Sequence, residues 1–267
     1  MNDPVVTLTV TDRVATVTLD SPTNRNALSP ALIDGLGDAL GDAIIDRRSR
    51  VILLTHTGPA FCAGADLRAV GGTRAARHTV PDILATIADS PKPVVARVAG
   101  HVMAGGVGLV AACDLSVATD DVRFGFTEVR VGVAPAIISV VCLPKLSRAD
   151  AAELLLTGER IPAARAVEVG LINRCVSSSE LDATVDAWVT ALIAGGPRAL
   201  AAAKRLIAEV PALDRDTAFI RTAEWSAELF ASEEAAEGMA AWAEKRPAAW
   251  IPAGPGPAPR GEPGTPG

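Results

Sequence analysis

The sequence contains few of the residues that build metal centres and disulfide frameworks. Histidine occurs three times and cysteine four times in 267 residues. The cysteines form no Cys-x-x-Cys pair, and no histidine has metal-ligand spacing with another histidine or with a cysteine. We therefore expect no metal site, and reduced thiols of the kind usual in a cytosolic protein.

Basic charge, aromatic residues and long apolar runs are also scarce. The net charge of −6, the pI near 5.2 and the 3% of aromatic residues argue against a nucleic-acid partner. No stretch approaches the ~20 uncharged apolar residues of a membrane span. The first residues show neither a basic region nor a long apolar run, so we expect no secretion signal. A hydrophobic content of 49% is enough for the core of one large domain.

The glycine-rich stretch at residues 104–112 organises the predicted architecture. It follows an apolar run at residues 93–98, which predicts a buried strand, and its small residues predict a helix. Gly105, Gly106 and Gly108 lie in the first turn, where backbone N–H groups have no partner inside the helix. An anion or a polarised carbonyl could approach these donors closely, because glycine has no Cβ. The alternative is close packing of the helix on the strand. The Gly-x-Gly-x-x-Gly dinucleotide fingerprint is absent.

The loop at residues 57–67 forms a second junction of the same kind. It follows a continuous apolar strand predicted at residues 51–55 and leads into a small, glycine-containing turn. Free backbone N–H groups would therefore be available at two separate strand–turn–helix junctions, one near Ala65 and one near Gly105. Two such donors aimed at one point are what an oxyanion hole requires. Asp66, just beyond, has an alternative role as the cap of a following helix.

The remaining pattern divides the chain into a mixed part and a helical part. A hairpin is expected within residues 5–19, and Ser29-Pro30 begins a helix. Further expected elements are helices at 82–88, 149–156, 162–169, 181–194, 197–209, 214–231 and 233–245, and a strand at 171–176. We expect a core at residues 1–195, a helical region at 196–252, and a disordered Pro/Gly-rich tail at 253–267. Large apolar residues of the helical region, Trp225, Phe230, Met239 and Trp242, would pack on another subunit or form a local core.

One carboxylate lies where solubility does not require it. Glu128 stands among Val129, Val131 and Val133. Desolvation by these valines would raise its pKa, so that it could act as an acid as well as a base. The alternative is a partly buried glutamate paired with a neighbouring arginine such as Arg130.

Short motifs follow one another in a fixed order along nearly the whole chain. They are residues 24–28 (Asn-Arg-Asn-Ala-Leu), 60–67, 92–95, 105–115, 124–128, 156–158, 166–171, 237–238 and 244–246. This ordered set resembles the enoyl-CoA hydratase/isomerase (crotonase) family, and the Gly-Val-Gly-Leu and Phe-Gly-x-x-Glu-Val-Arg segments look like its bacterial methylglutaconyl-CoA hydratase-like members. The resemblance implies an α/β spiral of ββα units followed by helices that mediate trimerisation, with trimers often paired into hexamers.

The resemblance also implies a ligand, an acyl-CoA thioester, with coenzyme A as part of the substrate and no separate cofactor. The backbone N–H groups of Ala65 and Gly105 would hold the thioester oxygen. Substrate contacts are implied at Arg25, which suits a CoA phosphate, and at Ala27, Ala63, Gly64, Asp66, Leu67, Gly106 and Gly108. We expect valine at Gly105 or Gly106 to abolish turnover while leaving the fold intact.

Glu128 falls at one of the family's two catalytic glutamate positions, and Gly108 stands at the other. We expect hydration of a 2-enoyl-CoA through a stabilised enolate, with double-bond isomerisation by the single glutamate as the alternative. A non-catalytic acyl-CoA-binding protein is a third possibility. If position 108 is vacant, Gly108→Glu should increase hydration. Residues 69–90, which begin with a loop or frayed helix, and residues 134–141 should set the pocket depth, and neither has a recognisable code for the acyl chain.

Overall fold

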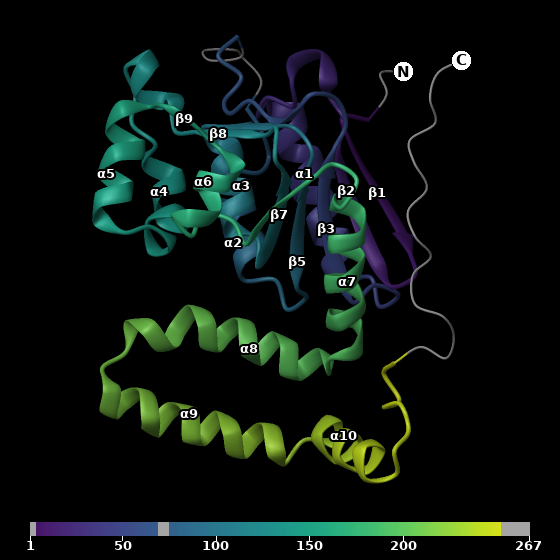
Figure 1. Ribbon diagram of the computed structural model, residues 1–267. Coiled ribbons are helices and arrows are strands. Elements are labelled where there is room, and N and C mark those ends of the chain that lie inside the picture. The colour runs from purple at the N-terminus through teal and green to yellow at the C-terminus, as the bar shows by residue number, and fades with distance from the viewer. Residues whose placement is uncertain (1–3, 69–74, 252–267) are drawn as a thin grey trace.

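The computed structural model describes residues 4–68 and 75–251 as two β-sheets flanked by helices, with strands of the smaller sheet running across those of the larger one (Figure 1). The strands are β1 (Val6–Thr11), β2 (Val14–Leu19), β3 (Val51–His56), β4 (Ala60–Cys62), β5 (Val94–Val98), β6 (His101–Met103), β7 (Leu115–Thr119), β8 (Arg123–Gly125), β9 (Arg160–Pro162) and β10 (Arg174–Val176). The helices are α1 (Pro30–Ile45), α2 (Val80–Ala88), α3 (Gly105–Ala112), α4 (Ala136–Cys142), α5 (Arg148–Thr157), α6 (Ala163–Glu168), α7 (Leu181–Ala194), α8 (Pro197–Glu209), α9 (Arg215–Phe230) and α10 (Glu233–Ala243).

A repeated ββα unit generates both sheets. In the described residues, the larger sheet has the strand order β1-β2-β3-β5-β7-β10, and the smaller one has the order β4-β6-β8-β9. The units β3-β4-α2, β5-β6-α3 and β7-β8-α4 each give their first strand to the larger sheet and their second to the smaller one. All neighbours from β2 onward pair in parallel, except β8 with β9. The predicted spiral of ββα units is therefore confirmed.

The larger sheet is buried on both faces, as the continuous apolar strands predict. Ile52 and Leu54 of β3 point toward α1, α2 and α3, whereas Leu53 points toward α7. The two faces alternate along the strand because successive side chains point to opposite sides. On α7, Val185 and Val189 complete the second layer. Helix α7 thus belongs to the core, and the chain leaves the core only after residue 194.

Most predicted elements are present. The Ser29 hydroxyl accepts the Leu32 N–H at 3.3 Å and caps α1, while α2 begins two residues before its predicted start. The strand expected at residues 171–176 is shorter, because the amides of Leu171 and Ile172 donate to the Ala166 carbonyl and end helix α6. The loop or frayed helix predicted from residue 69 falls partly, and the tail at 253–267 wholly, outside the described residues.

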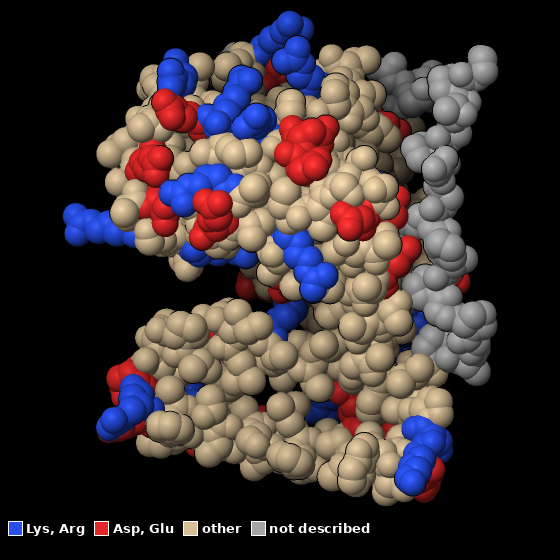
Figure 2. Space-filling model, in the orientation of Figure 1, with Lys and Arg blue, Asp and Glu red and all other residues tan. Residues whose placement is uncertain are grey.

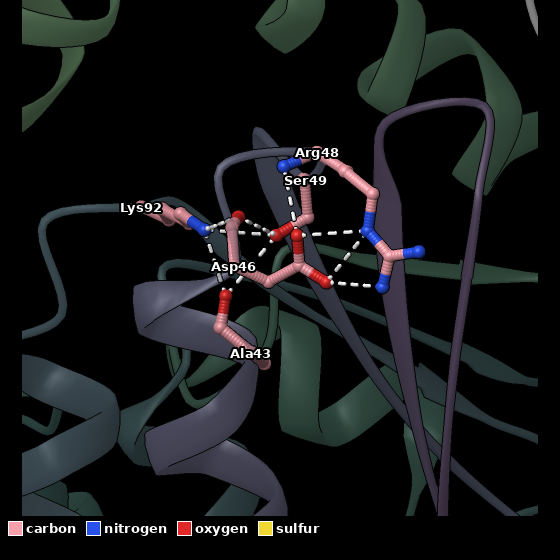
Figure 3. Close-up of polar contacts among 5 residues, drawn as sticks. All are labelled: Ala43, Asp46, Arg48, Ser49 and Lys92. Atoms are coloured by element: carbon pink, nitrogen blue, oxygen red, sulfur yellow. Dashed lines mark hydrogen bonds and ion pairs between the residues drawn. The ribbon is translucent and has the colours of Figure 1, made fainter.

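The C-terminal end of α1 is closed by a lysine from a neighbouring connection (Figure 3). The Lys92 Nζ donates to the carbonyls of Ala43 and Asp46, both at 2.7 Å, and to the Ser49 hydroxyl at 2.8 Å. These acceptors include carbonyls that the last turn of a helix leaves unpaired. The Arg48–Asp46 ion pair beside them is exposed on the arginine side.

We expect Lys92→Met to lower the free energy of unfolding by about 2 kcal/mol, the usual worth of hydrogen bonds from a charged, half-buried group. Arg48→Met is the matched control and should change it by less than about 0.5 kcal/mol, because surface ion pairs contribute little. Urea denaturation of both variants measures the difference. Equal losses in the two variants would contradict this role for Lys92.

Helices α8, α9 and α10 extend away from the sheets as an arm (Figure 1). The Lys204 Nζ of α8 lies 2.8 Å from the Asp114 carboxylate of the core. Figure 2 shows a hollow between α8 and the upper body, and mostly uncharged atoms along α8 and α9. Phe230, Met239 and Trp242 are 69%, 51% and 85% exposed. For these three residues the predicted alternative of a local core is therefore wrong, whereas Trp225 is half-buried and its ring lies 4.0 Å from the Arg205 guanidinium. No helix of the described part is long and apolar enough to cross a membrane.

Candidate active site

The two predicted junctions lie against each other. Gly64 has a φ of +87°, and a Cβ on it would lie 2.6 Å from the Ala104 Cβ and 3.3 Å from the Gly105 nitrogen. The Leu28 amide donates to the Gly64 carbonyl at 2.7 Å and holds the first junction in place. No hydrogen bond from the amides of Ala65 or Gly105 is found among the described residues. The two junctions thus lie side by side, each with an unpaired backbone donor; that both donors bind one oxygen stays a prediction.

A strained residue starts helix α3. Ala104 has φ +50° and ψ −122°, a sparsely populated conformation that costs roughly 1–3 kcal/mol. Its amide donates to the Gly125 carbonyl at 2.8 Å, which fixes the turn to β8. Helix α3 therefore begins directly after this residue, and the Gly105 amide takes no part in the hydrogen bonding of the preceding strand β6. Such strain gathers at sites where geometry serves a function.

The loop before α1 supports the first junction through a buried asparagine. The Asn26 Nδ2 donates to the carbonyls of Thr57 and Ala60 at 3.0 and 2.8 Å. The Arg25 carbonyl accepts the Ala63 amide at 3.1 Å. From the sequence, Asn26 stood out only as part of the motif at residues 24–28, and its supporting role was not predicted. Arg25 itself is exposed and Ala27 is buried, and their predicted CoA contacts stay predictions.

A cavity of about 670 Å³ opens beside the two junctions. It is lined by Ala63, Ala65, Leu67, Ala104, Thr127, Glu128, Arg130, Val131, Val133, Gly158, Glu159 and Arg160. This size is usual for sites that bind small molecules. Of the predicted site residues, Ala63, Ala65, Leu67 and Glu128 thus share one cavity.

Glu128 lies in a short 3₁₀ helix, Thr127–Val131, just after β8. Its Oε2 is buried without a hydrogen-bond partner in the described part of the chain, and desolvation raises the pKa of this carboxyl. Arg130 does not pair with it: the Arg130 Nε donates to the Thr157 carbonyl at 3.0 Å. The alternative role of Glu128 in an ion pair with Arg130 is therefore wrong. Val131 and Val133 are more than half exposed on the cavity wall, so the predicted valine shield is open in a single chain.

The position of the second family glutamate is not vacant. A Cβ on Gly108 would overlap the Ile138 Cγ2 and lie 2.9 Å from the Ile138 Cβ, because α3 and α4 cross closely here. Gly108 is buried and does not line the cavity. The expectation that Gly108→Glu increases hydration is therefore wrong, because a glutamate side chain at position 108 has no room.

Gly106 also serves packing, the alternative role that the sequence left open for these glycines. A Cβ on it would lie 2.7 Å from the Cys62 carbonyl oxygen of β4. The expectation that valine at position 106 leaves the fold intact is therefore wrong. A Cβ on Gly105 meets the Leu28 Cδ1 at 2.6 Å, the end of a side chain that can move.

Asp66 closes a local turn. Its Oδ1 accepts the Arg68 amide at 3.1 Å, and the residue is half-buried. The residues that would form the helix it was expected to cap, from residue 69, lie outside the described part. Its predicted contact with CoA remains a prediction.

Sequence reasoning missed the part of the cavity that follows α5. Glu159 and Arg160 reach it because β9 pairs with β8, with Arg160 opposite Gly125. A three-residue strand gives too short a pattern to be predicted. The αL turn at Gly158 ends α5 and directs the chain into this pairing.

The fold and the cavity define a crotonase-type α/β protein. An enoyl-CoA hydratase structure from Mycobacterium smegmatis superimposes with a TM-score of 0.85 at 34% identity, covering 93% of this chain and 99% of that one. One from Mycobacterium avium has a TM-score of 0.70 at 45% identity, covering 93% and 100%.

The chain belongs to the enoyl-CoA hydratase/isomerase family, whose sequence profile matches residues 9–252. Carnitinyl-CoA dehydratase of Salmonella typhi is 33% identical over 259 residues, which cover 91% of this chain and 97% of that protein. The family resemblance noted from the motifs is thereby confirmed. The finer likeness to methylglutaconyl-CoA hydratases stays a prediction.

Proposed function

We propose that the protein shifts the double bond of an enoyl-CoA thioester between carbons 3 and 2, with Glu128 as the group that moves the proton. One observation carries this proposal: Glu128 faces the cavity beside the two junctions, while Ile138 fills the place of a second glutamate above Gly108. Isomerisation needs one proton-transfer group, whereas the two-glutamate hydration of the family needs two. A purely non-catalytic binding protein would not need the Glu128 carboxyl group in this cavity, so its presence favours an enzyme.

The thioester oxygen would accept hydrogen bonds from the amides of Ala65 and Gly105. When a base removes a proton from carbon 2, negative charge moves onto this oxygen, and fixed donors stabilise the charge where it develops. The raised pKa of Glu128 suits such a base, because the carboxyl can take a proton and return it. Returning the proton to carbon 4 completes the double-bond shift without net loss of any atom.

Hydration of a 2-enoyl-CoA is the second candidate. Two observations favour it: the similarity of the chain to enoyl-CoA hydratases, and Glu159, whose place in the cavity offers a second carboxylate for a water molecule. We place either reaction in a reducing compartment such as the cytoplasm, because Cys62, Cys113 and Cys142 are buried free thiols.

Separate assays of the purified protein distinguish the reactions. A 3-enoyl-CoA should give its 2-enoyl isomer, followed by chromatography, faster than a 2-enoyl-CoA gains water. Faster hydration would favour the second candidate, and loss of that hydration in Glu159→Gln would assign the water to Glu159. No turnover of short- or long-chain thioesters of either kind would contradict both.

The contact between Gly108 and Ile138 can be tested by replacing both residues. We expect Gly108→Glu alone to lose stability without gaining hydration, because overpacking a buried contact costs about 1–3 kcal/mol. Gly108→Glu combined with Ile138→Ala makes room for the carboxyl and should recover stability and raise the ratio of hydration to isomerisation at least tenfold. A gain from Gly108→Glu alone would show that the position is open.

We also propose that the arm of α8, α9 and α10 joins copies of this chain into a trimer or a pair of trimers. Exposed Phe230, Met239 and Trp242 and the mostly uncharged face of the arm support this (Figure 2). Light scattering at micromolar concentration should give at least three times the monomer mass. Trp242→Arg should lower this mass, and a monomeric wild-type protein would contradict the proposal.

A further inference from the structure

Two arginines line the same cavity as Glu128 and bring positive charge to it. Arg130 lies two residues after Glu128 in the 3₁₀ helix, and Arg160 lies on β9. Within residues 4–68 and 75–251, neither has a carboxylate within 4 Å. Other arginines, such as Arg97 and Arg165, do have such partners.

Backbone and side-chain contacts hold both arginines at the cavity. The Arg130 Nε donates to the Thr157 carbonyl at 3.0 Å, which leaves its terminal nitrogens available to a ligand. The Arg160 Cγ lies 3.2 Å from the position of a Cβ on Gly125, a position that also contacts the Met103 Sδ and the Thr127 Cγ2 at 3.3 Å. The glycine at position 125 thus lets the arginine stem lie flat across β8.

The close contact of α3 with α4 leaves no space for an acyl group between these two helices. Gly108 and Ile138 are pressed together and absent from the cavity lining, so the space between these helices is filled. Ala65 of the first junction, Glu128 and the two arginines all line this one cavity. Glu128 and Glu159 add two carboxyl groups to the same lining, but neither forms an ion pair with Arg130 or Arg160 in the described residues, so both guanidinium groups remain open to a ligand.

We propose that Arg130 and Arg160 bind a carboxylate at the far end of the acyl group, so that the substrates are CoA thioesters of unsaturated dicarboxylic acids. This inference rests on the proposed function of the same cavity. Guanidinium groups recognise carboxylates through paired, charge-assisted hydrogen bonds. The same chemistry would recognise a phosphate of CoA, and a comparison of substrates distinguishes the two sources of negative charge.

The test compares hex-3-enedioyl-CoA with hex-3-enoyl-CoA, which differ only in the terminal carboxylate. We expect the wild-type protein to turn over the first with the higher kcat/KM. Arg130→Met and Arg160→Met should each reduce the ratio of the two kcat/KM values about 10- to 100-fold, the usual effect of losing a hydrogen bond to a charged group. Arg123→Met, on β8 but outside the cavity, is the matched control and should leave the ratio unchanged.

Binding of saturated thioesters separates this inference from the proposed reaction. Hexanedioyl-CoA should bind more tightly than hexanoyl-CoA in titration calorimetry, and the difference should vanish in the two variants even if no enoyl-CoA is turned over. Equal loss of affinity for both thioesters would assign the arginines to a CoA phosphate and overturn the inference. So would a wild-type preference for the uncharged thioester, or an unchanged ratio in folded variants with native circular dichroism.

Discussion

Glu128→Gln should reduce turnover on the best enoyl-CoA substrate by about 10²- to 10⁴-fold, the range for loss of an acid–base group. The amide keeps the size of the carboxyl and can still form hydrogen bonds, but it cannot carry a proton to carbon. Affinity for a saturated acyl-CoA should stay within about threefold of the wild type. Steady-state kinetics and titration calorimetry measure the two quantities. Wild-type turnover in this variant would overturn the mechanism.

The pH dependence gives an independent check on Glu128. Burial raises the pKa of this carboxyl above the ordinary 4.5. Since the base must be ionised, kcat/KM of the wild type should rise with pH through an apparent pKa above 4.5. Glu159→Gln is the matched control for removing a cavity carboxyl. If isomerisation is the reaction, kcat/KM of this control variant should rise with pH as it does in the wild type.

The same carboxyl should weaken the fold at neutral pH. A folded-state pKa above the unfolded value means that ionisation is less favourable in the folded chain. The cost is absent below pH 4.5, grows as the pH rises from 4.5 to the folded-state pKa, and is fully present above that pKa. We therefore expect Glu128→Gln to unfold at a higher temperature than the wild type at pH 7 and at the same temperature near pH 4. A lower value at pH 7 would point to a structural role for the carboxylate.

Local signals predicted many of the elements of this fold. Helices α7 and α8 begin and end where the periodicity places them, because their ends carry glycine and proline signals at Gly195, Gly196 and Pro197. The two strand–turn junctions followed from short apolar runs that stop at small residues. Such features depend only on residues adjacent in the chain, so they can be predicted from the sequence alone.

Contacts between distant segments could not be predicted in this way. Arg160 reaches the cavity only because β9 pairs with β8, and the space above Gly108 is filled only because α4 crosses α3 at Ile138. The sequence pattern at Gly108 is the same whether a ligand, a water molecule or a side chain faces it. Whether position 108 has room for a second carboxyl group therefore depends on tertiary packing.

The packing role of Gly106 predicts a large loss of stability from a single methyl group. Gly106→Ala would place its Cβ 2.7 Å from the Cys62 carbonyl oxygen and 2.8 Å from the Cys62 Cβ. Both atoms belong to β4, which cannot move without separating the smaller sheet from α3. We expect a loss of about 3 kcal/mol in the free energy of unfolding, at the upper end for overpacked cores. Turnover should fall with the folded fraction.

Gly105→Ala, one residue earlier, is the matched control. Its Cβ meets only the end of the Leu28 side chain, at 2.6 Å, and rotation of that side chain can relieve the contact. We expect a stability change below about 1 kcal/mol. Any shift of the Gly105 backbone that remains after Leu28 has moved would displace its amide and lower kcat by up to 10²–10³-fold, as for loss of one oxyanion donor. Denaturation and kinetics on both variants should thus separate packing at position 106 from catalysis at position 105. Equal stability of the two variants would contradict this division.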